Sequence, residues 1–219
     1  MPSTYEFGII EIDISNTRSV GSDTNTAALA FGAGALAPRS KSFYLEEMNS
    51  GDHSYSLVGY GEPDRSWLRI QEVTVDLCES AAASWSIVNS GNGDKTRLVA
   101  SVLTKAMEDA VNDFLKDTLK DELKEAGVAA GGAWGGPLGS LVGAAIGRLL
   151  DSALDFIFTN CDGLVDVGSL AYPIGWRLQQ AVLESPEHRL TGSATYVGDH
   201  PGRDCRVSNY TVKWYVLWT

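Results

Sequence analysis

The chain has 219 residues, of which 28 are acidic and 17 basic, so its formal net charge is −11, and 44% of its residues are hydrophobic. This apolar content, with six tryptophans, excludes a disordered chain and is enough for one domain of ordinary size to bury a core. The negative charge argues against nucleic acid as a partner, because binding to a phosphate backbone needs a cationic surface.

The N-terminus, MPSTYEFGIIEIDIS, lacks the basic region, long apolar core and cleavage site of a secretory signal. We therefore expect a soluble protein without a classical signal peptide, either resident in the cytosol or released by another route and then membrane-associated. Three cysteines, Cys78, Cys161 and Cys205, allow one disulfide and a free thiol, or three reduced thiols.

Residues 1–92 have the pattern of short β-strands. The opening segment places apolar side chains on both of its faces, as in a strand that is partly covered on each side. These side chains are Tyr5, Phe7 and Ile9 on one face, and Ile10 and Ile12 on the other. The run AALAFGAGALA at 27–37 is too short to span a bilayer as a helix and predicts a buried strand. Turn-forming sequences such as NSGD, GEPD and NSGNGD separate the later segments.

Residues 163–219 return to the same pattern. Every second side chain of the last strand-like segment is apolar, which gives the strand one wholly apolar face. These residues are Tyr210, Val212, Trp214, Val216 and Trp218. We expect this part to complete the sandwich begun by residues 1–92, with LTGSATYVG as a neighbouring strand.

The middle of the chain, residues 93–162, predicts helices. Apolar residues recur every three or four positions over 96–125, which is the period of an amphipathic helix. A second helical pattern begins near Pro137 and ends near Asn160. The expected fold class is therefore α+β: a β-sandwich or jelly-roll-like body with an inserted long helical hairpin.

The segment GVAAGGAWGGPLGSLVGAAIG at 127–147 places glycine at every fourth position. It resembles the glycine zippers of the membrane-inserting segments of pore-forming proteins, and the resemblance is limited to 127–147. The resemblance implies membrane insertion or close helix packing by Gly127, Gly131, Gly135, Gly139, Gly143 and Gly147, with Trp134 as an interfacial anchor. Pro137 divides the tract, so a closely packed hairpin in the folded soluble protein is the alternative interpretation.

Signatures of the common hydrolases, nucleotide-binding proteins and zinc proteins are absent from the sequence. His200 and Cys205 lie close together in GDHPGRDC, but a Gly/Pro turn favours ordinary polar loop residues over a catalytic pair. Aspartates in the turns raise the alternative of calcium, although their spacing matches no calcium-loop signature. These are Asp23, Asp52, Asp64, Asp94, Asp199 and Asp204. We expect no catalytic residue, metal or cofactor.

The leading hypothesis is a pore-forming or membrane-perturbing protein of the toxin or defence kind, which forms homo-oligomers and inserts its glycine-zipper hairpin into a target membrane through an unknown receptor. The alternative is a non-enzymatic binding or assembly module that uses the hairpin for close-packed protein–protein contact.

Overall fold

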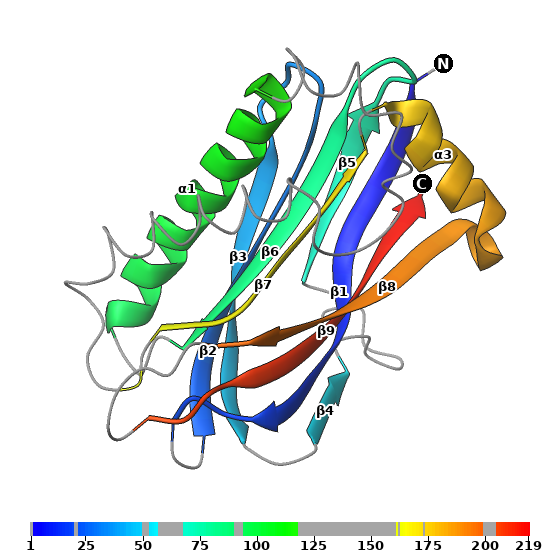
Figure 1. The fold of residues 1–219 in the computed structure, drawn as a ribbon. Coiled ribbons are helices and arrows are strands. Elements are labelled where there is room, and N and C mark those ends of the chain that lie inside the picture. The colour runs from blue at the N-terminus through cyan, green and yellow to red at the C-terminus, as the bar shows by residue number, and fades with distance from the viewer. Residues whose placement is uncertain are drawn as a thin grey trace.

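The computed structural model describes residues 2–19, 22–49, 53–56, 68–89, 94–117, 161, 163–172, 174–198 and 205–219. These residues form two antiparallel sheets, two α-helices and a short 3-10 turn (Figure 1). Sheet A has the order β4-β1-β9-β8, and β5 also pairs with β1. Its strands are β4 (His53–Ser56), β1 (Ser3–Asn16), β9 (Asn209–Trp218), β8 (Arg189–Val197) and β5 (Arg69–Val75).

Sheet B has the order β3-β2-β6-β7. Its strands are β3 (Arg39–Asn49), β2 (Ser22–Ala33), β6 (Ala81–Asn89) and β7 (Gly163–Tyr172). Both sheets combine strands from the two ends of the chain, because β7 pairs with β6 and β9 pairs with β1. The helices are α1 (Asp94–Asp117) and α3 (Gly175–Glu184), and the 3-10 turn is η1 (Pro186–His188).

The main core lies between the two sheets. Aromatic side chains from both sheets meet there, with the rings of Phe7 and Trp85 6.2 Å apart and those of Trp85 and Trp214 6.5 Å apart. The alternation expected for the last strand is confirmed at Tyr210, Val212, Trp214 and Val216, which are buried, whereas Trp218 at its end is exposed. Leu178 and Val182 of α3 also belong to this core, so α3 covers it near the two chain termini (Figure 1).

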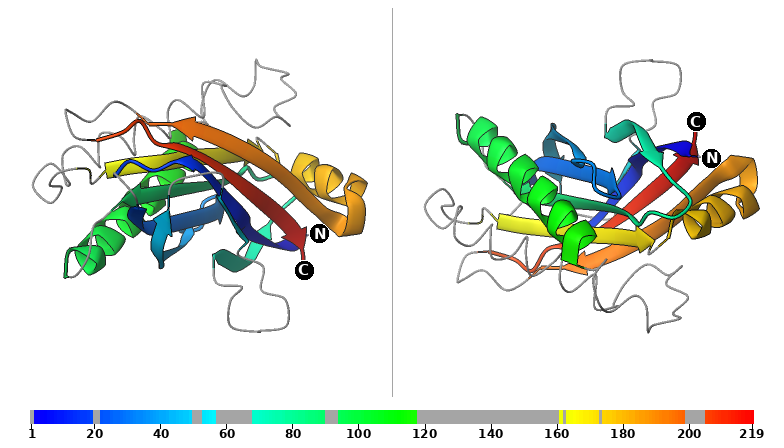
Figure 2. Two further views of the ribbon diagram at one scale, coloured as in Figure 1. Left: turned by 90° about the horizontal axis from the view of Figure 1, so that it is seen from below. Right: turned by 90° about the horizontal axis from the view of Figure 1, so that it is seen from above.

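Helix α1 packs on the outer face of sheet B, so the layers are helix, sheet B and sheet A (Figure 2). Small side chains such as Ala28, Ala30 and Ala82 line this face of the sheet and let the helix approach closely. The helix contributes an apolar stripe at the predicted three- and four-residue spacing. The stripe consists of Val99, Leu103, Met107, Ala110 and Phe114, all buried.

The predicted fold class is wrong. The described residues are mostly strand, and their two α-helices are separated along the chain by β7, so they form no long helical hairpin. The amphipathic pattern of α1 was interpreted as one arm of a helical hairpin, and the structure shows that sheet B buries its apolar face. The predicted second arm, residues 137–160, lies outside the described residues, and α3 was not predicted.

The face assignment in the first strand is also corrected. Tyr5, Phe7 and Ile9 share the core face as expected, but Ile12 joins them there. The register with β9 shifts between Ile9 and Glu11, so Ile10 is the extra residue of a β-bulge. Because of the extra residue, the side chains after the bulge point to the opposite face from the one that strict alternation predicts. Strict alternation therefore placed Ile12 on the wrong face.

Candidate functional site

Among the described residues, the outer face of sheet A differs from the outer face of sheet B. No described helix covers sheet A as α1 covers sheet B, and the outward side chains of β8 are exposed. The polar residues Thr191, Ser193 and Thr195 occupy every second position there, because successive side chains of a strand point to opposite faces. An antiparallel sheet can present such a solvated face, and this face holds the candidate site.

One row of residues crosses four strands at the centre of the site. Thr191 on β8 lies opposite Tyr215 on β9, which lies opposite Gly8 on β1, and Gly8 lies opposite Arg69 on β5. The tyrosine ring lies against Gly8, since a Cβ there would be only 2.6 Å from its Cε1 atom. The glycine therefore makes room for the ring to lie flat on the sheet.

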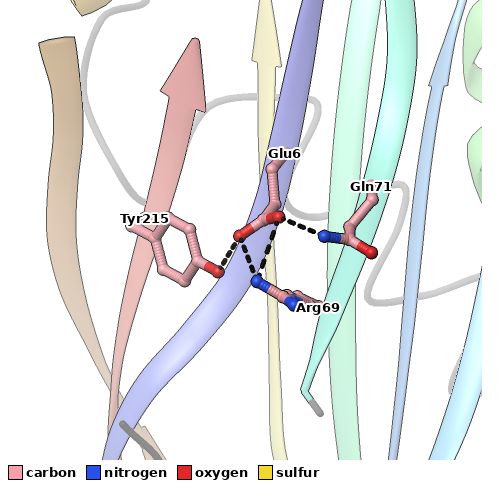
Figure 3. Close-up of polar contacts among 4 residues, drawn as sticks. All are labelled: Glu6, Arg69, Gln71 and Tyr215. Carbon is pink, nitrogen blue, oxygen red and sulfur yellow. Dashed lines mark hydrogen bonds and ion pairs between the residues drawn. The ribbon is translucent and has the colours of Figure 1, made fainter. Parts of the chain in front are cut away.

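A buried carboxylate organises the polar groups around this ring (Figure 3). Glu6 is only 5% exposed, although it belongs to the outward face of β1. Its Oε1 accepts a hydrogen bond from the Tyr215 hydroxyl at 2.5 Å, and its Oε2 accepts one from Gln71 Nε2 at 2.9 Å. The Nη1 of Arg69 contacts both carboxylate oxygens at 3.4–3.5 Å. A carboxylate with partners on both oxygens holds all three side chains in place.

A second guanidinium lies on the other side of the ring. The Cζ atom of Arg189 on β8 is 5.6 Å from the centroid of Tyr215, in a cation–π contact. Two arginines and one buried carboxylate thus surround the tyrosine, and one of the arginines, Arg69, forms an ion pair with the carboxylate of Glu6. Arg69 has a third of its side chain exposed, so its guanidinium also reaches solvent.

Burial raises the pKa of the Tyr215 hydroxyl well above its ordinary value, and the hydrogen bond to Glu6 raises it further. The tyrosine is therefore neutral at physiological pH and donates its proton to Glu6 as a permanent hydrogen bond. A neutral phenol hydrogen-bonded in this way is a poor general base or nucleophile. The arrangement offers hydrogen-bond donors and positive charge, which are the means of binding.

Another ion-pair group adjoins the site on the same face. Lys213 Nζ on β9 lies 2.8 Å from Glu11 and 3.4 Å from Asp13, both on β1. The hydrogen bond to Glu11 raises the pKa of Lys213, so its charge persists through the physiological range. The single positive charge of this lysine faces two acidic neighbours, whereas no ion pair of Arg189 is found among the described residues.

The predicted glycine-zipper site lies outside the described residues. This applies to Gly127, Gly131, Gly135, Gly139, Gly143, Gly147 and Trp134. Among the helices that the structure describes, none is both long and apolar enough to cross a membrane. The prediction of a toxin that forms pores by inserting a helical hairpin is therefore corrected, because the described architecture is β-rich with two separate helices. The role of the glycine tract itself stays a prediction.

The catalytic and calcium alternatives find no site among the described residues. Cys205 forms a disulfide with Cys161, so its sulfur is not a free thiol, and His200 is not described. Asp23 is buried and accepts hydrogen bonds from the backbone N–H groups of Arg18 and Ser19 and from the Tyr210 hydroxyl. Within the described ranges, no group of three or more His, Cys, Asp and Glu side chains could hold a metal ion.

The aspartates at positions 52, 64, 199 and 204 lie outside the described residues, and the side chain of Asp94 at the start of α1 is not described. The disulfide joins Cys161, two residues before β7, to Cys205 in the segment before β9, and it leaves Cys78 as an exposed free thiol. Of the two disulfide states that the sequence left open, the structure has one bridge and one free cysteine.

We compared the chain with known protein families, curated proteins and solved structures. No family model matches the chain, no curated protein is similar to it, and no solved structure matches it.

The site around Tyr215 was not predicted from the sequence. One available signal was Glu6, a lone carboxylate between the apolar Tyr5 and Phe7, with Gly8 on the same outward face. The sequence did not show that Tyr215 and Arg69 lie opposite Gly8, because they are over 200 and about 60 residues away along the chain.

Proposed function

We propose that this protein is a non-enzymatic binding module whose binding surface is the outer face of sheet A. The observation that carries the proposal is the row of Thr191, Tyr215, Gly8 and Arg69, extended by Arg189 over the tyrosine ring. Its polar groups are held in place by Glu6 before any ligand arrives, and this lowers the entropy cost of binding.

The chemistry of the surface favours an acidic glycan as the ligand. The two guanidinium groups beside Tyr215 suit a carboxylate of the ligand, because arginine binds carboxylates through paired N–H donors. Hydroxyl groups of Thr191, Ser193 and Thr195 extend the surface along β8 and suit the hydroxyl groups of a sugar chain. A sheet face with exposed side chains along β8 can accept an extended chain along its length.

The disulfide supports a location outside a reducing cytosol. Disulfides such as Cys161–Cys205 persist in oxidising compartments and are rare in the cytosol. We therefore propose that the protein is released or exported, where it would meet extracellular glycans.

Calorimetric titration with an oligomer of galacturonic acid, against a neutral oligosaccharide of the same length, tests this function. We expect the acidic oligomer to bind more tightly, and Arg189→Ala to weaken its binding by about tenfold through loss of a charge-assisted hydrogen bond. Lys41→Ala is the matched control, because Lys41 is a cation on β3 of sheet B that lies over Phe43. Equal binding of both oligosaccharides, or an equal loss in Lys41→Ala, would contradict the proposal.

A further inference from the structure

The four sheet edges of the molecule differ in how they resist pairing with another chain. An edge strand exposes unpaired backbone N–H and C=O groups, and proteins protect such edges with charges, bulges, short strands or an inward charged residue. Sheet A ends at β8 on one side and at β4 and β5 on the other, and sheet B ends at β3 and β7.

Three of these edges carry protection. At the edge of sheet A formed by β4 and β5, strand β4 has only four residues. The register of β5 with β1 is shifted, and Glu72 of β5 has a positive φ of 57°. Strand β3 carries Arg39 and Lys41, and its register with β2 is shifted too. Strand β7 has a register shift with β6 and places the carboxyl of Asp166 in the buried interior.

Strand β8 has none of these features after its first residue, Arg189. Its register with β9 runs unbroken from Arg189 to Val197, and after Arg189 the sequence LTGSATYV contains neither a charge nor a proline. In the part of the chain that the structure describes, β8 pairs on one side only, with β9. Val197 at its end is 59% exposed. Among the described residues this edge is long and regular, and only its first residue is charged.

We propose that β8 pairs antiparallel with β8 of a second copy, so that two sheets A join into one continuous sheet across a two-fold axis at Ser193. This inference is independent of the proposed glycan binding, because it rests on the edge of the sheet and not on the groups around Tyr215.

The sequence of β8 suits pairing with itself. A two-fold axis at Ser193, the middle residue of the strand, uses its full length and places Thr191 opposite Thr195 of the second copy. The molecule already contains such a pair, since the hydroxyl groups of Thr195 and Thr211 lie 2.8 Å apart across β8 and β9. Arg189 would face the uncharged Val197 of the second copy, so no like charges oppose each other.

Sedimentation velocity of the full chain over a micromolar concentration series tests the pairing. We expect wild type to shift from monomer to dimer, and Ser193→Glu to remain monomeric because two carboxylates would meet at the axis. Within the monomer the introduced carboxylate would lie opposite Lys213, so the fold should tolerate it. Thr74→Glu, at an exposed position of β5, is the matched control and should dimerise as wild type does.

A mixing experiment separates loss of pairing from loss of folding. Ser193→Lys should also be monomeric alone, and an equal mixture of the Glu and Lys variants should regain the dimer through opposite charges at the axis. A wild type that stays monomeric, a Ser193→Glu variant that dimerises normally, or a mixture that stays monomeric would overturn the proposal. A monomeric Thr74→Glu variant would overturn it as well, because the effect would then not be specific to β8.

Discussion

Asp166 is a carboxyl group fully enclosed between the sheets. Its Oδ1 accepts a hydrogen bond from Trp85 Nε1 at 2.8 Å, whereas its Oδ2 has no hydrogen-bond partner. The indole fits because residue 168 is glycine, where a Cβ would lie 2.0 Å from Trp85 Cζ2. Burial raises the pKa of Asp166 well above its ordinary value, and the hydrogen bond from Trp85 opposes this only in part.

This burial makes folding stability depend on pH. The folded protein holds the Asp166 proton more tightly than the unfolded chain, whose aspartate pKa is about 4. The stability that this group contributes is therefore full below that pH and is lost as the pH rises through the raised folded-state pKa. Asp166→Asn removes the titration, so the free energy of unfolding of the variant should rise relative to that of wild type as the pH increases from 4 to 8.

Urea denaturation at pH 4, 6 and 8 would measure this difference. Asp113→Asn serves as the control, because Asp113 is exposed on α1 and should show no comparable change with pH. If wild type gained stability relative to Asp166→Asn as the pH rose, the assigned burial of the carboxyl would be incorrect.

At the scale of the elements, α1 is held to sheet B by one face only. Leu103 is fully buried against the sheet, whereas Leu98 on the same helix is 52% exposed. Leu103→Ala leaves a cavity that the close-packed alanines of the sheet cannot fill, so it should lower the free energy of unfolding by about 2–5 kcal/mol. Leu98→Ala should change it by less than about 0.5 kcal/mol.

Chemical denaturation followed by tryptophan fluorescence would compare these two variants. Equal losses of stability for the two leucines would mean that the helix does not pack on the sheet through Leu103.

The same helix shows what the sequence could and could not predict. The spacing of Val99, Leu103 and Met107 identified a helix and its apolar face, because both depend on residues within a few turns. The spacing did not identify the surface that covers this face, which comes from β2 and β6. Helix α3 was missed because only two of its apolar residues, Leu178 and Val182, are buried, which is too few for a clear period.

The sequence predicted less of the candidate site than of the fold, because it gave the face of Tyr215 but not the residues that surround it. Alternation in the last strand placed Tyr210 and Trp214 toward the core, and it therefore placed Tyr215 on the outer face. The partners of Tyr215 depend on the pairing of β9 with β1 and of β1 with β5. Bulges within both pairs change the register, so alternation alone could not bring Glu6, Arg69 and Tyr215 together.

At the scale of the whole molecule, the proposed dimer would change the spacing of the binding surfaces. A two-fold axis perpendicular to the sheet keeps both outer faces on the same side. Each Tyr215 lies opposite Thr191, one strand in from β8 and two residues from Ser193. With strands about 4.8 Å apart and about 3.3 Å per residue, the two tyrosines would lie roughly 20 Å apart. One glycan chain could then contact both sites.

The net charge predicts how salt affects the dimer. Each copy carries −11, so two copies repel each other over their whole surfaces, while the proposed contact along β8 from Leu190 to Val197 contains no charge. Added salt screens the repulsion and leaves the backbone hydrogen bonds unaffected. We therefore expect the dimer dissociation constant to fall by roughly two- to tenfold between about 0.03 M and 0.3 M sodium chloride.

Sedimentation velocity at several salt concentrations would measure this change. The mixture of Ser193→Glu and Ser193→Lys variants is the internal comparison, because screening weakens the attraction between their introduced charges and offsets the gain. Salt should therefore strengthen the mixed dimer less than the wild-type dimer. A wild-type dimer that dissociates as salt is added would be held by ion pairs, and the uncharged edge of β8 could not be its interface.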